Sequence, residues 1–268
     1  MKWQTLKVAI KGRLATIMLN RPDVSNALNE TLVKELESGF RELADSGEIR
    51  VIVLASTGKC FSAGADLRWM KTMADLSEEE NIADAYRFAA MLRTIYTCPK
   101  PVIARVHGDA YGGGVGLIAA ADIAVAADSA CFSLSEVKLG LIPATISPYV
   151  IRAIGARAAR RYFITAERFD AAEALRIGLL HKIAPTDALD SVIESLVAAV
   201  LQNGPGAVAK SKRLVHDLDG QSLSEELLAD TARRIAATRA TDEAREGVRA
   251  FLEKRLPAWV ADPSAAER

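Results

Sequence analysis

Two apolar runs, the first continuous and the second broken only by Arg105, constrain the fold of this chain more than any other feature. Residues 51–55 (Val-Ile-Val-Leu-Ala) and 101–106 (Pro-Val-Ile-Ala-Arg-Val) have the length of β-strands, and such runs are typical of strands covered on both faces of a sheet. Each run leads into a loop that contains glycine and then into a helix-like segment, about 50 residues apart along the chain. This repetition predicts an α/β fold of stacked β-β-α units.

The segments around these runs support the same fold class. Residues 6–10 and 14–19 are β-like and flank Gly12, which predicts an antiparallel hairpin. Asn29 is placed to cap a helix that extends to about Ala44. Further strands are expected at 123–127 and 131–133. Beyond Pro143 the strands nearly cease, and helical patterns dominate to residue 255.

The second glycine loop suggests a position where this chain binds an anion. Gly112, Gly113 and Gly114 lie between an apolar strand and a helix-like run that begins at Leu117. Bare backbone amides at such a position favour an anion, which is either a phosphate or an oxyanion that develops during a reaction. Leu117 replaces the third glycine of the dinucleotide-binding pattern, so that fingerprint is not matched.

Composition excludes several classes of function. The 268 residues carry 34 Lys plus Arg and 34 Asp plus Glu, so net charge gives no case for a nucleic-acid partner. Cys60, Cys98 and Cys131 fall in no metal-ligand spacing, which favours a reducing compartment. No apolar run reaches transmembrane length, and the chain does not open on an apolar signal. We expect a cytoplasmic protein that does not bind a membrane.

Five motifs in register resemble the crotonase, or enoyl-CoA hydratase/isomerase, superfamily over nearly the whole chain. The resemblance is strongest to bacterial methylglutaconyl-CoA hydratases around Glu136. The five motifs are Leu-Asn-Arg-Pro (19–22) with Asn-Ala-Leu (26–28), Phe-Ser-Ala-Gly-Ala-Asp-Leu (61–67), Lys-Pro-Val-Ile (100–103) with the glycine triplet, Leu-Arg-Ile-Gly-Leu (175–179), and residues 246–255.

The resemblance implies an architecture and an assembly. A crotonase-like spiral of β-β-α units would occupy residues 1–200, and a C-terminal helical trimerisation region residues 201–268. The protein would bind acyl-CoA thioesters as a homotrimer or a dimer of trimers. Coenzyme A would be part of the substrate, and neither a metal nor a separate cofactor is expected.

The resemblance also implies a site. The backbone amides of Ala65 and Gly113 would form an oxyanion hole for the thioester carbonyl, and Glu136 would be the catalytic acid or base. The remaining residues expected to bind the substrate or its coenzyme A portion lie in the same loops: Ala27, Ala63, Gly64, Asp66, Leu67 and Gly112. From its position alone, Asp66 is more simply explained as a cap for the helix that begins at Leu67.

One departure from the family's pattern leaves the reaction open. Two-glutamate hydratases carry carboxylates at the positions of Gly116 and Glu136, and here only the second is present. We expect hydration of a branched 2-enoyl-CoA, most specifically 3-methylglutaconyl-CoA of leucine or isoprenoid degradation. A Δ3,Δ2-enoyl-CoA isomerase and a non-catalytic acyl-CoA binding protein are the alternatives. Candidates to hold a distal carboxylate are Arg68, Lys71, Ser147 and Tyr149.

Overall fold

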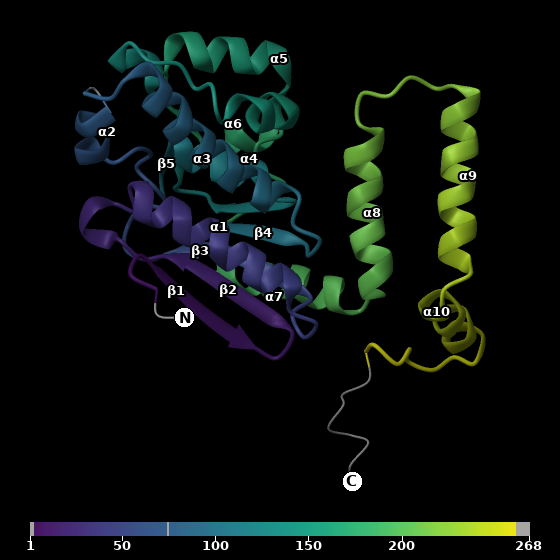
Figure 1. Cartoon of the computed structure of the whole chain (residues 1–268). Coiled ribbons are helices and arrows are strands. Elements are labelled where there is room, and N and C mark those ends of the chain that lie inside the picture. Colours follow the sequence, from purple (N-terminus) through teal and green to yellow (C-terminus); the bar gives the residue numbers. More distant parts are fainter. Residues whose placement is uncertain (1–2, 74, 261–268) are drawn as a thin grey trace.

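A six-stranded sheet forms the centre of the molecule in the computed structural model, which describes residues 3–73 and 75–260 (Figure 1). The strand order is β1-β2-β3-β4-β6-β9. The first pair is an antiparallel hairpin, and every later pair is parallel. The strands are β1 (Leu6–Lys11), β2 (Leu14–Leu19), β3 (Val51–Ser56), β4 (Val102–Val106), β6 (Ile123–Ala127) and β9 (Lys182–Ala184).

Strand β3 is covered on both faces, as its apolar sequence predicts. Ile52 and Leu54 belong to the larger core cluster, which also contains residues of the helices α1 (Glu30–Asp45), α3 (Glu78–Tyr96) and α4 (Gly113–Ala120). The alternate residues Val51 and Val53 belong to a second cluster with helix α7 (Leu189–Leu201). Because successive side chains of a strand point to opposite faces, a strand between two layers of helices must be apolar at every position.

Side-chain caps begin the two long helices beside the sheet. Asn29 accepts a hydrogen bond from the amide of Leu32 at 2.9 Å at the start of α1. Ser77 and Glu80 form a reciprocal capping box at the start of α3. Each cap satisfies amide groups that have no partner within the helix, so these sequence positions fix where the helices begin.

A smaller three-stranded sheet lies beside the main one, in the order β5-β7-β8. One of its strands leads into the glycine triplet, and another ends just before the segment around Glu136. Its strands are β5 (Ala110–Tyr111), β7 (Cys131–Ser133) and β8 (Phe169–Asp170).

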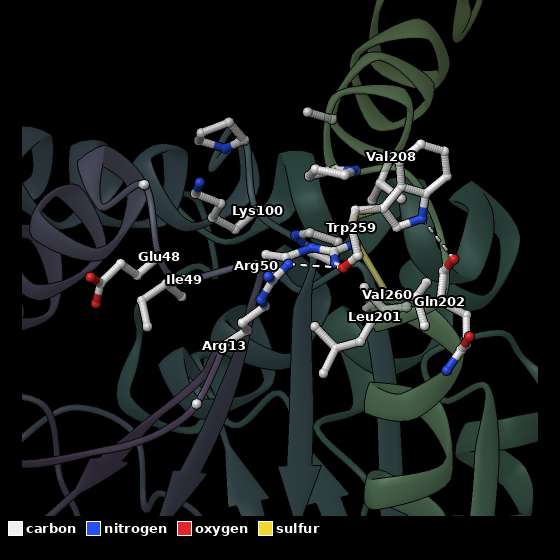
Figure 2. Close-up of a pocket in the computed structure, with 17 residues that line it drawn as sticks. Arg13, Glu48, Ile49, Arg50, Lys100, Leu201, Gln202, Val208, Trp259 and Val260 are labelled. Atoms are coloured by element: carbon white, nitrogen blue, oxygen red, sulfur yellow. Dashed lines mark hydrogen bonds between the residues drawn. The ribbon is translucent and has the colours of Figure 1, made fainter. Parts of the chain in front are cut away.

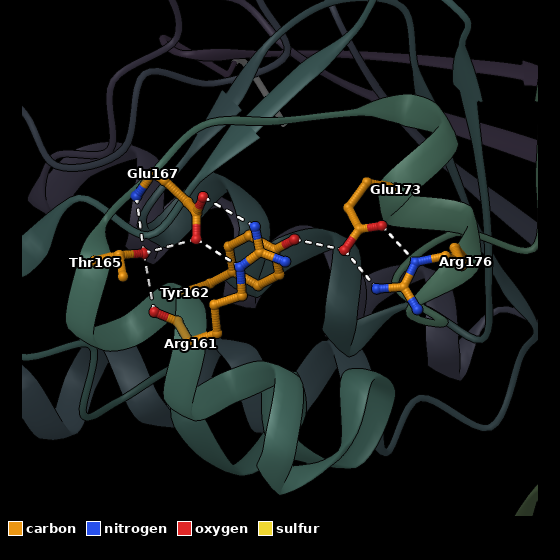
Figure 3. Close-up of polar contacts among 6 residues, drawn as sticks. All are labelled: Arg161, Tyr162, Thr165, Glu167, Glu173 and Arg176. Carbon is orange, nitrogen blue, oxygen red and sulfur yellow. Dashed lines mark hydrogen bonds and ion pairs between the residues drawn. The ribbon is translucent and has the colours of Figure 1, made fainter.

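A polar network holds together the chain that leads into and out of β8 (Figure 3). The Tyr162 hydroxyl donates to Glu173 Oε1 at 2.6 Å and joins α5 (Ser147–Thr165) to α6 (Ala171–Arg176). Arg176 binds the same carboxylate, and Arg161 binds Glu167 through two bonds. Burial and the Glu173 carboxylate raise the pKa of Tyr162 to about 12. The tyrosine therefore stays a hydrogen-bond donor at all ordinary pH values.

Three helices follow α7 and extend away from the sheet (Figure 1). They are α8 (Pro205–Leu218), α9 (Glu225–Arg239) and α10 (Asp242–Leu252). Many of their large apolar side chains are exposed: Val215, Leu228, Ile235, Val248, Phe251 and Leu252. The last eight residues of the expected C-terminal region lie outside the described residues. Among the described helices none is by itself long and apolar enough to cross a membrane, although the bent pair α7–α8 passes that test jointly.

The α/β crotonase fold expected from the sequence is confirmed, with two local differences. The sequence does not predict strand β9, because three residues that begin with a lysine and end before Pro185 carry little strand signal. Helix α4 begins within the glycine triplet, at Gly113, rather than at Leu117. Packing against neighbouring elements decides both, since glycine by itself disfavours a helix.

Candidate active site

The glycine triplet lets the chain turn from β5 into α4 while it passes close to other groups. Gly112 has φ +47° and ψ −115°, and a Cβ atom there would lie 2.9 Å from Glu136 Oε1. A Cβ atom on Gly113 would lie 2.7 Å from Leu28 Cδ1. Glycine at these two positions leaves the Glu136 carboxylate and the Leu28 side chain in place, because a Cβ atom would push against one or the other.

The loop after β3 supplies the second element of the site. Leu28 forms a parallel bridge with this loop: its amide donates to Gly64 O at 2.7 Å, and Asp66 donates to Leu28 O at 2.9 Å. In a parallel bridge the central residue, here Ala65, directs its own N–H away from the partner strand. The two glycine-bearing loops also touch, since a Cβ on Gly64 would lie 2.9 Å from Tyr111 O.

The amides of Ala65 and Gly113 are available to a ligand. Within residues 3–73 and 75–260, neither N–H donates to a backbone carbonyl or to a side chain. Gly113 is the first residue of α4, where an amide has no helical partner. Both residues line the same cavity, of about 350 Å³. Free amides from two loops, one of them at a helix N-terminus, form a suitable environment for a developing oxyanion.

Glu136 lies in this cavity at the start of a short 3₁₀ turn (Glu136–Leu139). Its Oε2 atom is buried, with no hydrogen-bond partner among the described residues. Burial raises the pKa of Glu136 above its usual range, and its own backbone amide opposes the shift. A carboxyl group of this kind holds a proton more readily at neutral pH, as is useful in an acid that must donate to carbon.

Position 116 has no room for a second glutamate. A Cβ atom on Gly116 would lie 2.3 Å from Ile146 Cγ2 and 2.9 Å from Ile146 Cβ. Ile146 is itself buried at the start of α5 and lines the cavity wall. The packing therefore excludes the glutamate that two-glutamate hydratases carry at this position, because Ile146 occupies the space that its side chain would need.

A second buried carboxylate, which sequence reasoning missed, comes from α3. Asp84 lines the cavity with Glu136 and is 6% exposed. Burial raises its pKa, although Arg87 opposes the shift. Helical periodicity in the sequence could have identified this residue. Asp84 lies on the same helix face as Phe88, Leu92 and Ile95, so it is an acidic residue on a face that packs inward.

The six residues expected to bind the substrate or its coenzyme A portion lie in the loops beside the cavity, and none of them lines it: Ala27, Ala63, Gly64, Asp66, Leu67 and Gly112. Ala63 and Leu67 are exposed, and Ala27 is buried beside them. Asp66 is buried, binds Arg21 at 2.8 Å and accepts from the amide of Arg68 at 2.8 Å, in agreement with its expected capping role.

The four candidates for holding a distal carboxylate do not contribute to the cavity. Within the part of the chain that the structure describes, its lining contains no arginine or lysine, and neither Ser147 nor Tyr149 belongs to it. The full lining is Leu28, Ala65, Trp69, Met73, Asn81, Asp84, Ala85, Phe88, Gly113, Glu136, Ile142, Pro143, Thr145 and Ile146. Among the described residues, no three His, Cys, Asp or Glu side chains are grouped so that they could hold a metal ion.

A β-β-α spiral with two free amides and a buried carboxylate in one cavity defines a protein of the crotonase type. The chain belongs to the enoyl-CoA hydratase/isomerase family, whose model matches residues 9–262. It is 37% identical over 260 residues to a Mycobacterium bovis protein named "Probable enoyl-CoA hydratase echA8", with 96% of this chain and 98% of the relative covered.

Solved structures agree with this assignment. The crystal structure of an enoyl-CoA hydratase from Shewanella pealeana superposes with a TM-score of 0.94 at 43% identity, covering 96% of this chain and 97% of that one. Pseudomonas aeruginosa AtuE superposes with a TM-score of 0.92 at 35% identity, covering 96% and 100%. This family membership makes an acyl-CoA the expected class of substrate.

Proposed function

We propose that this protein hydrates a 2-enoyl-CoA ester through a thioester enolate. The observation that carries the proposal is the unpartnered carboxyl oxygen of Glu136, in the cavity lined by Ala65 and Gly113. The thioester oxygen accepts hydrogen bonds from the two amides. Water adds to C3, the π pair of the C2–C3 double bond shifts to C1–C2, and the carbonyl π pair moves onto the thioester oxygen to give the enolate. Glu136 then donates a proton to C2 and recovers one from the water.

Asp84 is the residue that we assign to the water. Hydration requires a group that orients water beside C3, and the packing of Ile146 removes the family's usual carboxylate from position 116. Asp84 enters the same cavity from α3 and is almost completely buried. A carboxyl group can accept a hydrogen bond from water and hold it in place, so this residue compensates for the missing glutamate.

The lining of the cavity favours an uncharged acyl group. Among the described residues two carboxyl groups and no arginine or lysine line it, so nothing in the lining would pair with a distal carboxylate on the substrate. The specificity for 3-methylglutaconyl-CoA that the resemblance suggests stays a prediction. It requires the distal carboxylate to reach a cation outside the cavity.

Isomerisation of a 3-enoyl-CoA is the second candidate, and the glycine at position 116 favours it. Moving a proton from C2 to C4 needs one carboxylate, and Glu136 suffices for this if Asp84 has no part in the reaction. In that case the buried Asp84 would only contact the acyl chain. A non-catalytic binding protein would retain the cavity but leave every ester unchanged.

Ultraviolet absorbance distinguishes these functions in one panel of esters. Methylglutaconyl-, 3-methylcrotonyl-, crotonyl- and 3-hexenyl-CoA are incubated with the protein. Loss of the conjugated enoyl thioester signal means hydration, and gain from 3-hexenyl-CoA means isomerisation. Tight binding without any change in absorbance would contradict both enzymatic proposals. Turnover of the methylglutaconyl ester alone would refute our argument from the lining charges.

An Asp84→Asn variant tests the assignment of the water. We expect hydration to fall by about 100-fold or more, as for other positioned acid–base groups, with little change in ester affinity. Asp75→Asn is the matched control, because Asp75 is exposed and does not line the cavity. Unchanged hydration in the Asp84 variant would remove this residue from the mechanism and leave Glu136 as the sole acid.

We also propose that α8, α9 and α10 assemble the chain into a homotrimer or a dimer of trimers. The support is the set of large apolar side chains that these helices expose, such as Phe251 at 82% and Leu252 at 74%. Exposed apolar surface on this scale marks an interaction site. Sedimentation of the purified protein tests the assembly, and a monomer at micromolar concentration would contradict it.

A further inference from the structure

A cavity at the opposite edge of the sheet has a charge composition that neither the proposed reaction nor the family comparison explains. It encloses about 760 Å³ and lies where β2, β3 and β4 begin, whereas both glycine-bearing loops follow the ends of strands. We call it the amino-edge pocket. Figure 2 shows it beneath Trp259, with Arg13 and Arg50 side by side.

Three cations contribute to this pocket, and none has an anionic partner among the described residues. They are Arg13, Arg50 and Lys100. Arg13 directly precedes β2, Arg50 directly precedes β3, and Lys100 lies two residues before β4. Nη1 of Arg13 and Nη1 of Arg50 both donate to the carbonyl oxygen of Trp259, at 2.9 and 3.0 Å. One neutral carbonyl thus serves two guanidinium groups, which leaves their positive charge uncompensated.

Arg50 is the most constrained of the three. It is only 8% exposed, and its Nε atom is buried without a hydrogen-bond partner. Its other nitrogens bind the carbonyls of Trp259 and Asn203. Burial lowers the pKa of Arg50, and the neighbouring Arg13 lowers it further. Buried charges in proteins are ordinarily paired, so this arrangement is incomplete without an anion.

The nearby carboxylates do not complete it. Glu48 lines the pocket, but it is exposed and points away from the arginines in Figure 2. Glu243, whose charge reaches Arg50, accepts hydrogen bonds from the amides of Gly206 and Ala207 at the start of α8, at 2.8 and 2.7 Å. The remaining wall is largely apolar, with Val200, Leu201, Val208, Trp259 and Val260.

We propose that the amino-edge pocket binds a small organic anion, in which a carboxylate or phosphate lies among Arg13, Arg50 and Lys100 and a short apolar group lies against Trp259. Among the described residues Arg13 uses only Nη1, so its Nη2 and Nε remain for the two oxygens of such an anion, and Arg50 and Lys100 add positive charge beside it. The bound anion would also strengthen the attachment of the segment around Trp259 to the sheet, since two of the three cations already hold its carbonyl.

Tryptophan fluorescence and thermal unfolding of the full chain measure this binding. Hexanoate, inorganic phosphate and hexanol are titrated separately at constant ionic strength, with and without saturating coenzyme A. We expect hexanoate to raise Tm and change the fluorescence in a saturable manner that coenzyme A does not suppress. An equal response to phosphate and to hexanoate would show that only the charged group binds, and would contradict the proposed apolar contact with Trp259. A response to hexanol but not to hexanoate would overturn the proposal.

Matched variants locate the site. Lys100→Met removes a cation whose ammonium group has no hydrogen-bond partner among the described residues, so folding should be preserved. We expect hexanoate to bind about tenfold or more weakly after this loss of a charge-assisted bond. Lys7→Met, on the exposed side of β1, is the control. Trp259→Phe should abolish the fluorescence change while the Tm shift remains. Unchanged affinity in Lys100→Met, or displacement by coenzyme A, would refute this site without affecting the proposed hydration.

Discussion

Replacement of Glu136 by glutamine separates catalysis from folding most sharply. Glutamine keeps the shape of the side chain, so it fits the same space beside Gly112. It removes the proton that the carboxyl group would transfer to C2. A positioned acid or base contributes about 100- to 10,000-fold to a rate, equivalent to about 2.7 to 5.4 kcal/mol. We therefore expect kcat/KM for hydration to fall within that range.

Stability should respond in the opposite direction. Because burial raises the pKa of Glu136, folding favours its protonated form. That favourable contribution is complete below the ordinary pKa of about 4.5 and is lost as the pH rises through the raised folded-state value. At pH 7.5 the native protein thus bears the cost of a buried carboxylate that glutamine lacks. Glu136→Gln should unfold at the same or a higher temperature at pH 7.5, and the two proteins should converge near pH 4.

The assay combines three measurements on wild type, Glu136→Gln and the surface control Glu79→Gln. Hydration is followed by absorbance, ester affinity by calorimetry with a non-reactive acyl-CoA, and stability by thermal unfolding. Activity of Glu136→Gln within tenfold of wild type would refute the assignment of the proton to this residue. A large loss of affinity with unchanged kcat would show that the residue binds substrate and does not transfer a proton.

Three further outcomes follow from packing and charge. Gly116→Ala should destabilise the protein by about 1–3 kcal/mol in urea unfolding, because Cβ would lie 2.3 Å from Ile146 Cγ2; an equal cost in an Ile146→Ala background would disprove that contact. Burial opposes ionisation of Asp66, but hydrogen bonds and charge from Arg21 and the Arg68 amide lower its pKa overall. The ionised Asp66 therefore stabilises the folded protein above about pH 4, and this contribution is lost as the pH falls. Asp66→Asn should make the free energy of unfolding less dependent on pH in the acid range, and an unchanged dependence would contradict the role of Asp66. Phe251→Asp should shift the sedimenting species towards monomer without loss of helicity, and an unchanged assembly would place Phe251 outside the interface.

The sequence by itself determined the architecture and singled out three of the residues that line the candidate site. The apolar run at β3 specified a strand between two helical layers, and Asn29 fixed where α1 begins. These features depend on neighbours in the chain or on periodicity, which a single sequence displays. The motifs likewise placed Ala65, Gly113 and Glu136 in one site, and the structure brings these three residues to one cavity.

Only the tertiary structure decided what surrounds those residues. Ile146 fills the space beside Gly116. Asp84 lines the cavity from α3, a helix that contains none of the family motifs named in the sequence analysis. The pairing of Arg13 and Arg50 on the carbonyl of Trp259 joins positions more than 200 residues apart. Such contacts depend on shape and distance between remote segments. Side-chain packing decides which of these contacts form, and the local propensities of the residues do not predict that packing.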